Sequence, residues 1–376
     1  MINSVSIKNY KSVVDVSLPL GRFNLLIGAN GCGKSNILEG IAMGAAASSN
    51  KLDYEYFANR GIRVVEPRLM TPAFTEKQDE TILVSIRLDG NIVANYPIVY
   101  NKNAKPARWE CGVKFDEALS KSDSAQDMFQ ELENRLGSKV TIALDPSSNR
   151  WTAVAGNDLL DKFLIYSLEE NKLRKADDSN RTYPLGRHGE GLFAYIKELS
   201  QKPEGIEIIN EIKENLKVLD WFDDMEVPSG QLSMEFNLKL KDSYLADTIN
   251  AFDQRSTNEG FLYLLFYLTL VISDETPRFF AIENIDTAFN PKLCREVTRR
   301  LIELARKHNK QIIATTHNAA VLDGMNLFED DVRLHVVRRN IDGYTKTNRV
   351  TLKDDMTMPL SEAWVKGFIG GLPDNF

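Results

Sequence analysis

The sequence contains 376 residues, with 46 Lys and Arg against 53 Asp and Glu, which gives a formal net charge of −7. Hydrophobic residues make up 43% of the chain and charged residues 26%, so the composition excludes a disordered, collagen-like or disulfide-scaffold protein. The length suits two or three lobes with substantial cores. Cys32, Cys111 and Cys294 lie far apart without metal-type spacing, which predicts a reducing compartment, the cytoplasm.

The sequence predicts no membrane segment. Residues Met1 to Lys8 alternate apolar and polar side chains like a strand and lack the apolar core of a signal peptide. The most apolar stretch, Gly260 to Ser273, is shorter than the roughly 20 residues of a membrane-spanning helix and is expected to be a buried helix. The mildly acidic balance favours a protein partner over a nucleic acid, although a local basic groove would still permit DNA or RNA binding.

The first half of the chain is expected to begin with strands and one helix. Apolar runs and alternation predict strands at 5–8, 15–18, 23–27, 81–99, 140–144 and 151–154. The apolar spacing of Ile37, Leu38 and Ile41 predicts a helix over 34–43, directly after a glycine-rich turn. The polar stretch 121–137 is also expected to be helical.

The second half is expected to change from helices to alternating strands and helices. Residues 158–247 have the least clear sequence pattern, and we expect a mostly helical lobe there. Helices are expected at 191–199, 206–216, 260–273 and 292–308, and strands at 278–282 and 311–315. Strands alternating with long helices indicate a parallel sheet with crossovers. We therefore predict an N-terminal part at 1–155, a helical lobe and insertion at 156–255, and a C-terminal part at 256–376.

A phosphate-binding loop is the strongest motif. The segment matches G-x-x-x-x-G-K-[ST] and lies between a predicted strand and a predicted helix, which is the context that supports the motif over a plain glycine turn. Its residues are Gly28, Ala29, Asn30, Gly31, Cys32, Gly33, Lys34 and Ser35. Backbone N–H groups and the helix N-terminus would face phosphate oxygens, Lys34 would neutralise the β- and γ-phosphates, and Ser35 would ligate Mg²⁺.

Residues 7–12, 23–27 and 28–39 together resemble the start of the ABC-type AAA-family ATPases related to SMC, RecF and the OLD (overcoming lysogenisation defect) proteins. The resemblance covers 1–44 and 258–376. It implies an α/β fold, a P-loop NTPase of ABC type. Such a fold has a mixed sheet with antiparallel N-terminal strands, a parallel core and a helical lobe or insertion. It also implies ATP and Mg²⁺ as cofactors.

The segment after the 278–282 strand resembles a Walker B motif with an altered end. The family usually ends it with Asp-Glu, whereas this chain has Glu283-Asn284. Glu283 still reaches Mg²⁺ directly or through water. The amide of Asn284 orients water but does not accept its proton, so general-base help of roughly 10²–10⁴ would be missing and slow hydrolysis is expected.

Two further residues are candidates to compensate for the missing base. Asp286 stands at the position that resembles the family's D-loop, with a helix-capping role as its alternative. His317 follows the predicted 311–315 strand and resembles the switch histidine that meets the γ-phosphate, with a hydrogen-bonded strand-end histidine as its alternative.

The segment 256–262 precedes the long apolar helix and resembles the family's signature loop, which caps the partner subunit's ATP. One register uses Ser256 as the signature serine. The other, which we favour, places Asn258, Glu259 and Gly260 over the family's Ser-x-Gly. A plain N-terminal cap is compatible with either register. The loop implies a homodimer, or a higher oligomer, with ATP between its heads.

The resemblance implies a small stand-alone OLD-like ATPase without a fused nuclease, since no acidic cluster with Toprim-like spacing follows His317. The expected function is an ATP-driven scaffold or switch for a separate effector, such as a nuclease or Toprim protein, in bacterial anti-phage defence. The alternative is a RecF-like ATPase that binds DNA for repair or loading.

Overall fold

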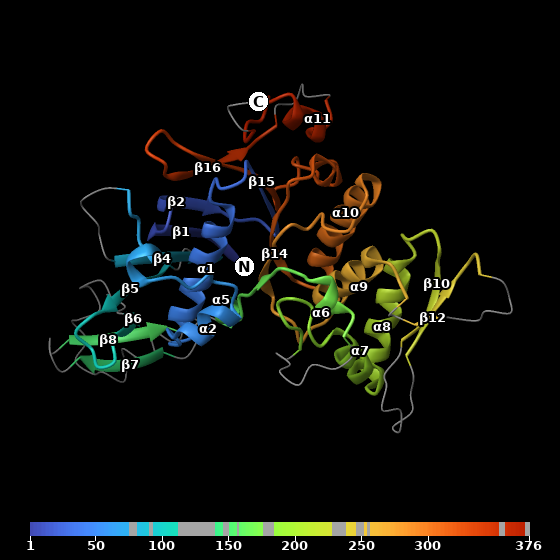
Figure 1. The fold of residues 1–376 in the computed structure, drawn as a ribbon, viewed down its shortest axis with the longest axis horizontal. Helices are drawn as coiled ribbons and strands as arrows, with labels where there is room; N and C mark the ends of the chain where they lie inside the picture. Colours follow the sequence, from blue (N-terminus) through green and yellow to red (C-terminus); the bar gives the residue numbers. More distant parts are fainter. Residues whose placement is uncertain are drawn as a thin grey trace.

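The chain forms a central sheet, with a second sheet on one side and a lobe of helices on the other (Figure 1). The computed structural model describes residues 1–74, 81–89, 93–111, 140–145, 150–155, 158–175, 184–227, 238–245, 252–253, 256–352 and 358–372. The helix expected at 121–137 lies outside the described residues. None of the helices in the described ranges is long and apolar enough to cross a membrane.

The N-terminal sheet is antiparallel throughout, as expected. Its strand order is β2-β1-β4-β5-β6. The strands are β1 (Ile2–Tyr10), β2 (Val13–Pro19), β4 (Thr81–Leu88), β5 (Val93–Asn101) and β6 (Arg108–Cys111). In β4, Ile82, Val84 and Ile86 are buried and alternate with partly exposed residues, so one face of the sheet covers a core. The expected strands at 140–144 and 151–154 form a separate ribbon, β7 (Val140–Asp145) with β8 (Arg150–Ala155).

The central sheet has the order β16-β15-β3-β14-β13-β9, with parallel pairing except at β16. The strands are β3 (Phe23–Ile27), β9 (Ile165–Tyr166), β13 (Phe279–Ile282), β14 (Gln311–Thr315), β15 (Val332–Arg339) and β16 (Thr345–Val350). All residues of β3, β13 and β14 are buried, which is typical of parallel strands covered on both faces. The predicted parallel core is confirmed.

Helix α1 (Lys34–Ser48) contacts β1, β4 and β5 and so lies against the N-terminal sheet. Ile37, Leu38 and Ile41 are fully buried, as their spacing predicts. Two short helices, α2 (Tyr54–Asn59) and α3 (Pro67–Met70), follow it. The phosphate loop is therefore fixed at both ends, by the central β3 and by a buried helix.

The lobe between the two halves of the sheet is less helical than predicted. The helices of 156–255 are α5 (Asp158–Asp161), which contacts α1, and α6 (Glu170–Leu173), α7 (Leu192–Ser200) and α8 (Pro203–Leu216); α9 (Glu259–Ile272) of the C-terminal part packs against α8. A three-stranded antiparallel sheet of β10 (Phe222–Glu226), β11 (Lys239–Asp242) and β12 (Phe252–Asp253) was not expected. These strands are short, and a register shift between Phe222 and Asp224 breaks the alternation that would have predicted β10.

The C-terminal part adds helices to the face of the central sheet that α9 covers, opposite α1. They are α10 (Pro291–Lys307), the short 3-10 helix η3 (Ala319–Gly324) and α11 (Leu360–Val365). Helix α10 begins at Asn290, whose side chain accepts a hydrogen bond from the Leu293 N–H. Figure 1 places β15, β16 and α11 together at the C-terminal end of the molecule.

Candidate nucleotide site

The phosphate loop takes a backbone path that requires glycine. Gly28, Gly31 and Gly33 all have positive φ, at 152°, 72° and 111°. A Cβ on Gly28 would lie 2.2 Å from the carbonyl oxygen of Val337, and one on Gly33 would lie 2.1 Å from Oγ1 of Thr345. The loop is thus pressed against β15 and β16, and bulkier residues at these glycines would push it away.

Lys34 is buried inside this loop with carbonyl oxygens around it. Its Nζ donates to the carbonyl oxygens of Gly28 (2.7 Å) and Ala29 (3.1 Å), and the residue is 8% exposed. Burial lowers the pKa of the ammonium, an effect opposed by the nearby thiol of Cys32 and the carboxylate of Glu283. No carboxylate among the described residues forms an ion pair with it. A buried ammonium ringed by neutral oxygens fits an anion such as a triphosphate.

A chain of side-chain hydrogen bonds ties the loop to two distant segments. The Ser12 and Thr345 hydroxyl oxygens lie 2.7 Å apart, and Thr345 also donates to the Cys32 carbonyl at 3.0 Å. Asn36 donates to the Ser12 hydroxyl at 2.7 Å. The β1–β2 turn, the loop and β16 are therefore linked by direct hydrogen bonds. The role of Thr345 was not predicted, because 310 residues separate it from the motif.

One turn along α1, the carboxylate of Glu39 gathers two cations and a phenol. Glu39 is 2% exposed and forms ion pairs with Lys11 and Arg63. The Tyr10 hydroxyl donates to it at 2.9 Å, and burial together with this carboxylate raises the pKa of Tyr10 well above its ordinary value. Arg63 in turn donates to the Asn36 amide oxygen at 3.0 Å, so the cluster is continuous with the phosphate loop.

The Walker B-like segment ends beside the loop. Glu283 follows β13, and its N–H donates to the carbonyl oxygen of Tyr166 in β9 at 2.8 Å. Asn284 has a left-handed backbone with φ of 50°, and its N–H donates to the Thr315 hydroxyl at 2.9 Å. Because carboxyl ends of parallel strands share one edge of a sheet, β3, β13 and β14 bring Lys34, Glu283 and Asn284 to the same edge.

Asp286 and His317 follow β13 and β14 at this edge. Asp286 does not cap a helix, since Asn290 caps α10; its carboxylate accepts from the Thr316 hydroxyl at 2.6 Å. His317 is exposed at the end of β14. Burial of part of its ring and the nearby Lys34 lower its pKa, and Asp286 opposes them. The imidazole thus shares the electrostatic environment of both residues.

The signature-like residues lie at a different place. Asn258 is the N-cap of α9, and its side chain accepts from the Phe261 N–H at 2.8 Å. Together with Glu259 and Gly260 it lines a cavity of about 500 Å³ to which Trp221 and Leu293 also contribute. Residues 28–35 are not part of that cavity's lining, which includes Asp220, Glu259 and Glu296 beside Lys292, so the helix end at 258–260 lies apart from the phosphate loop.

The edge strand β9 is a feature that the sequence pattern missed. It has two residues, Ile165 and Tyr166, and pairs in parallel with Ala281 and Ile282. A strand of this length gives no periodic signal. Its end places Ser167 beside the Walker B-like segment, and the Ser167 N–H donates to the carbonyl oxygen of Arg187 at 2.9 Å.

Comparison with known proteins agrees with this fold. The sequence matches the AAA ATPase domain family over residues 1–322. An SMC head solved with the C-terminal winged-helix domain of ScpA is 16% identical, with a TM-score of 0.56 over 94% of this chain and 99% of that one. An SMC head with an extended coiled coil, bound to the C-terminal domain of ScpA from Pyrococcus furiosus, is 12% identical. Its TM-score is 0.55, and the match covers 93% of this chain and 96% of that one. Among curated proteins, none matched the sequence.

The two SMC heads share the fold described here, an α/β P-loop ATPase with an antiparallel N-terminal sheet and a mixed parallel core. The family match spans β3, the phosphate loop, Glu283 and His317 in one domain. This chain belongs to the AAA ATPase domain family, and it has the fold of the SMC heads.

Proposed function

We propose that the protein binds ATP and Mg²⁺, pairs two heads around the nucleotide, and thereby acts as a switch for a separate effector protein. The observation that carries the proposal is the buried Lys34 ammonium, whose partners among the described residues are two carbonyl oxygens and the Cys32 sulfur, with no carboxylate at ion-pair distance. A bound phosphate would supply the missing negative charge. Family membership independently implies nucleotide binding.

Three residues would hold the nucleotide and its metal. Lys34 would neutralise phosphate charge, and the Ser35 hydroxyl and Glu283 carboxylate would supply oxygen ligands of the kind Mg²⁺ prefers. Mg²⁺ supplies charge neutralisation when it is bound. Ser35 begins the same helix as Lys34, and Glu283 contributes to the electrostatic environment of Lys34, so these groups face one region.

Slow hydrolysis is part of the proposal. Asn284 presents a neutral amide where the resemblance places a glutamate, and an amide does not take a proton from water. The Thr316 hydroxyl donates a hydrogen bond to the Asp286 carboxylate. This bond fixes the orientation of Asp286 next to His317. The pair would position water and sense the γ-phosphate. A long-lived ATP state would suit a switch that works through occupancy.

Residues 258–260 support the pairing of two heads. They begin α9, their cavity is separate from the phosphate loop, and a capped helix N-terminus attracts anions. Two heads facing each other would each cap the other's nucleotide. An SMC head of this fold binds a separate protein, ScpA, which supports a partner for this chain too. We propose a nuclease or Toprim protein as that effector, in defence against phage.

The test is ATP-dependent dimerisation measured by light scattering after size-exclusion chromatography. With ATP and Mg²⁺ the wild-type protein should double its mass. The Lys34→Ala variant should stay a monomer and bind ATP about 100-fold more weakly, because charge-assisted hydrogen bonds of about 1.5–3 kcal/mol are lost. Lys8→Ala is the control, since Lys8 is exposed and pairs only weakly with Asp15 at 3.6 Å. Wild-type ATP affinity in Lys34→Ala would refute the site.

A further inference from the structure

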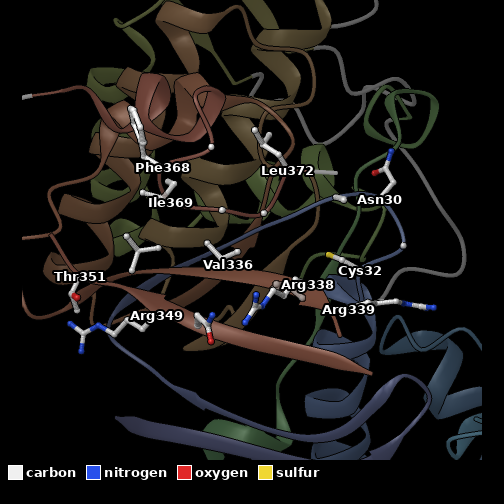
Figure 2. A pocket seen from close by; sticks show the side chains of 18 of the residues that line it. Asn30, Cys32, Val336, Arg338, Arg339, Arg349, Thr351, Phe368, Ile369 and Leu372 are labelled. Carbon is white, nitrogen blue, oxygen red and sulfur yellow. The ribbon is translucent and has the colours of Figure 1, made fainter. Parts of the chain in front are cut away.

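A large cavity lies between the β15–β16 hairpin and the chain that follows α11, and Ala29, Asn30, Gly31 and Cys32 of the phosphate loop form part of its lining. Its volume is about 1030 Å³. We call it the hairpin–tail pocket. Val336, Arg338 and Arg349 of the hairpin line it, as do Phe368, Ile369 and Leu372 of the tail. Figure 2 shows the three tail side chains above the hairpin and its arginines.

The hairpin side of the pocket is strongly cationic. Arg338, Arg339 and Arg349 all line it and are all exposed. Lys346 adds a fourth cation directly opposite Arg338 in the strand register. Within the described ranges, none of the four has an acidic partner at ion-pair distance, although the chain as a whole has a net charge of −7. The four cations belong to one hairpin and lack an acidic partner there, so an anionic segment along the hairpin would stabilise them.

The tail side of the pocket is apolar and unusually exposed. Phe368 is 68% exposed and Leu372 is 41% exposed, and Val365 beside them is 67% exposed. Val336 continues this apolar surface at the base of the hairpin. Large apolar side chains gathered in one concave place and bordered by arginines have the composition of a protein-binding site, in which aromatic residues and arginine are enriched.

The tail lies close to the phosphate loop at Gly371. Gly371 has a φ of 85°, and a Cβ there would lie 3.0 Å from Cγ1 of Val336 and 3.5 Å from Cα of Gly28. The Trp364 indole N–H beneath it is buried without an acceptor in the described part of the chain. An occupant of the pocket would therefore press directly on the segment that carries Gly28.

We propose that the hairpin–tail pocket docks an acidic segment of a partner protein that also carries apolar side chains. The carboxylates would pair with Arg338 and Arg349, and the apolar side chains would cover Phe368 and Leu372. A nucleic acid fits less well, because half of the pocket is apolar and has no cation. The proposal deepens the proposed function by naming where the effector binds, and it rests on that function for the link to ATP.

The experiment uses fluorescein-labelled synthetic peptides and the full-length protein, with binding measured by anisotropy. One peptide alternates Asp or Glu with Leu or Phe, a second replaces the acids by Gln, and a third replaces Leu and Phe by Ser. Oligothymidine is the nucleic-acid probe. The first peptide should bind best, and its binding should weaken as salt is raised. The other two peptides should bind at least about tenfold more weakly.

Variants locate the binding. Arg338→Glu with Arg349→Glu should weaken the acidic peptide about tenfold or more, and Phe368→Ser should do the same without a change of charge. Arg108→Glu is the matched control, since Arg108 is an exposed arginine of β6 that pairs with Glu110. Thermal unfolding of each variant shows whether it is folded.

Three outcomes would overturn the proposal: no binding of the acidic peptide, equal binding by the pocket variants, or arginine-dependent binding of oligothymidine in its place. ATP binding and ATP-dependent dimerisation are measured on the same samples. If the wild-type protein binds the acidic peptide but does not dimerise with ATP, the result would count against the proposed function alone. Loss of ATP binding in the Arg338 and Arg349 variant would assign the pocket to the nucleotide and so refute the docking site.

Discussion

Asn284 combines a chemical and a conformational property at one position. Its φ of 50° lies in the left-handed region, which asparagine tolerates better than most residues. Its N–H is held by the Thr315 hydroxyl, and its carbonyl oxygen accepts from the Thr287 hydroxyl at 2.8 Å. The side chain is therefore presented from a backbone that is fixed on both sides, and a substitution here tests chemistry and strain together.

Asn284→Glu should raise ATP turnover, because the carboxylate restores a proton acceptor whose help is worth roughly 10²–10⁴. The free energy of unfolding should fall by about 1 kcal/mol, since glutamate loses the asparagine preference for this backbone. Phosphate release and urea denaturation measure the two effects.

Asn284→Gln is the control for that substitution, since it adds the same length and strain without a base. Its turnover should stay at the wild-type level. An unchanged rate in Asn284→Glu would contradict the missing-base explanation, and Asp286→Asn would then show whether Asp286 acts in its place.

At the scale of elements, helix α1 connects the phosphate loop to the N-terminal sheet through Glu39. This carboxylate is buried, and Lys11 comes to it from the β1–β2 turn and Arg63 from the segment after α2. Removing a buried partner leaves two cations uncompensated, which costs more than the pair contributes. The cluster thus holds three segments of chain at the edge of the site.

Glu39→Gln should lower the free energy of unfolding by about 3 kcal/mol, within the range measured for broken buried ion pairs. Chemical denaturation monitored by fluorescence gives this value. Glu110→Gln removes an exposed carboxylate that pairs with Arg108, and should cost less than about 1 kcal/mol. Equal losses of unfolding free energy in Glu39→Gln and Glu110→Gln would show that the buried Glu39 cluster stabilises the protein no more than an exposed ion pair.

Strand β15 contains a histidine whose pKa predicts a pH effect on stability. His335 is 1% exposed, and burial, with Arg333 and Arg349 nearby, lowers its pKa from 6.5 to about 4. Between these values the unfolded chain binds the proton and the folded chain does not. The contribution of neutral His335 to the free energy of unfolding is therefore fully present above pH 6.5. It is lost as the pH drops towards 4, by up to about 3 kcal/mol.

His335→Leu should flatten the unfolding free energy over that pH window. Denaturation curves of the wild-type and variant proteins at several pH values measure the slope. The difference in the free energy of unfolding between the wild-type and variant proteins should be large near pH 4.5 and smaller near pH 7.5. The same pH slope in both proteins would contradict a role for His335.

The elements that carry the site motifs could be predicted from sequence because their signals are local. The residues from Phe23 to Ile41 have the patterns of a strand, a loop and a helix in direct succession. The apolar run before Glu283 is typical of another strand. The hairpin of β15 and β16 and the pocket beneath α11 could not be predicted. Their partners, such as Thr345 for Cys32, are set by tertiary register and leave no pattern in either segment.

At the scale of the whole molecule, the phosphate loop and residues 258–260 lie apart, and the proposed dimer would bring them to the same nucleotide from two protomers. Gly260→Asp places a negative charge where the partner's nucleotide would lie. Such a variant should bind ATP like the wild-type protein but lose ATP-dependent dimerisation by light scattering. Ile206→Asp is the control, since it adds an aspartate to the first turn of α8, where Ile206 is 50% exposed. Dimerisation of Gly260→Asp at the ATP concentrations that dimerise the wild-type protein would refute the second nucleotide contact.

The position of β3 has a consequence for how the protein is made. Both strands that flank it come from the far end of the chain, with Phe23 opposite Ile312 and Val332. A ribosome adds about 5–20 residues per second, so β3 waits roughly 15–60 s after its synthesis for a neighbour. The antiparallel pairing of β1 with β2 and β4 needs no such delay. The nascent protein therefore carries an apolar, unpaired strand for most of its synthesis, and chaperones that bind such segments should associate with it until the last quarter has emerged.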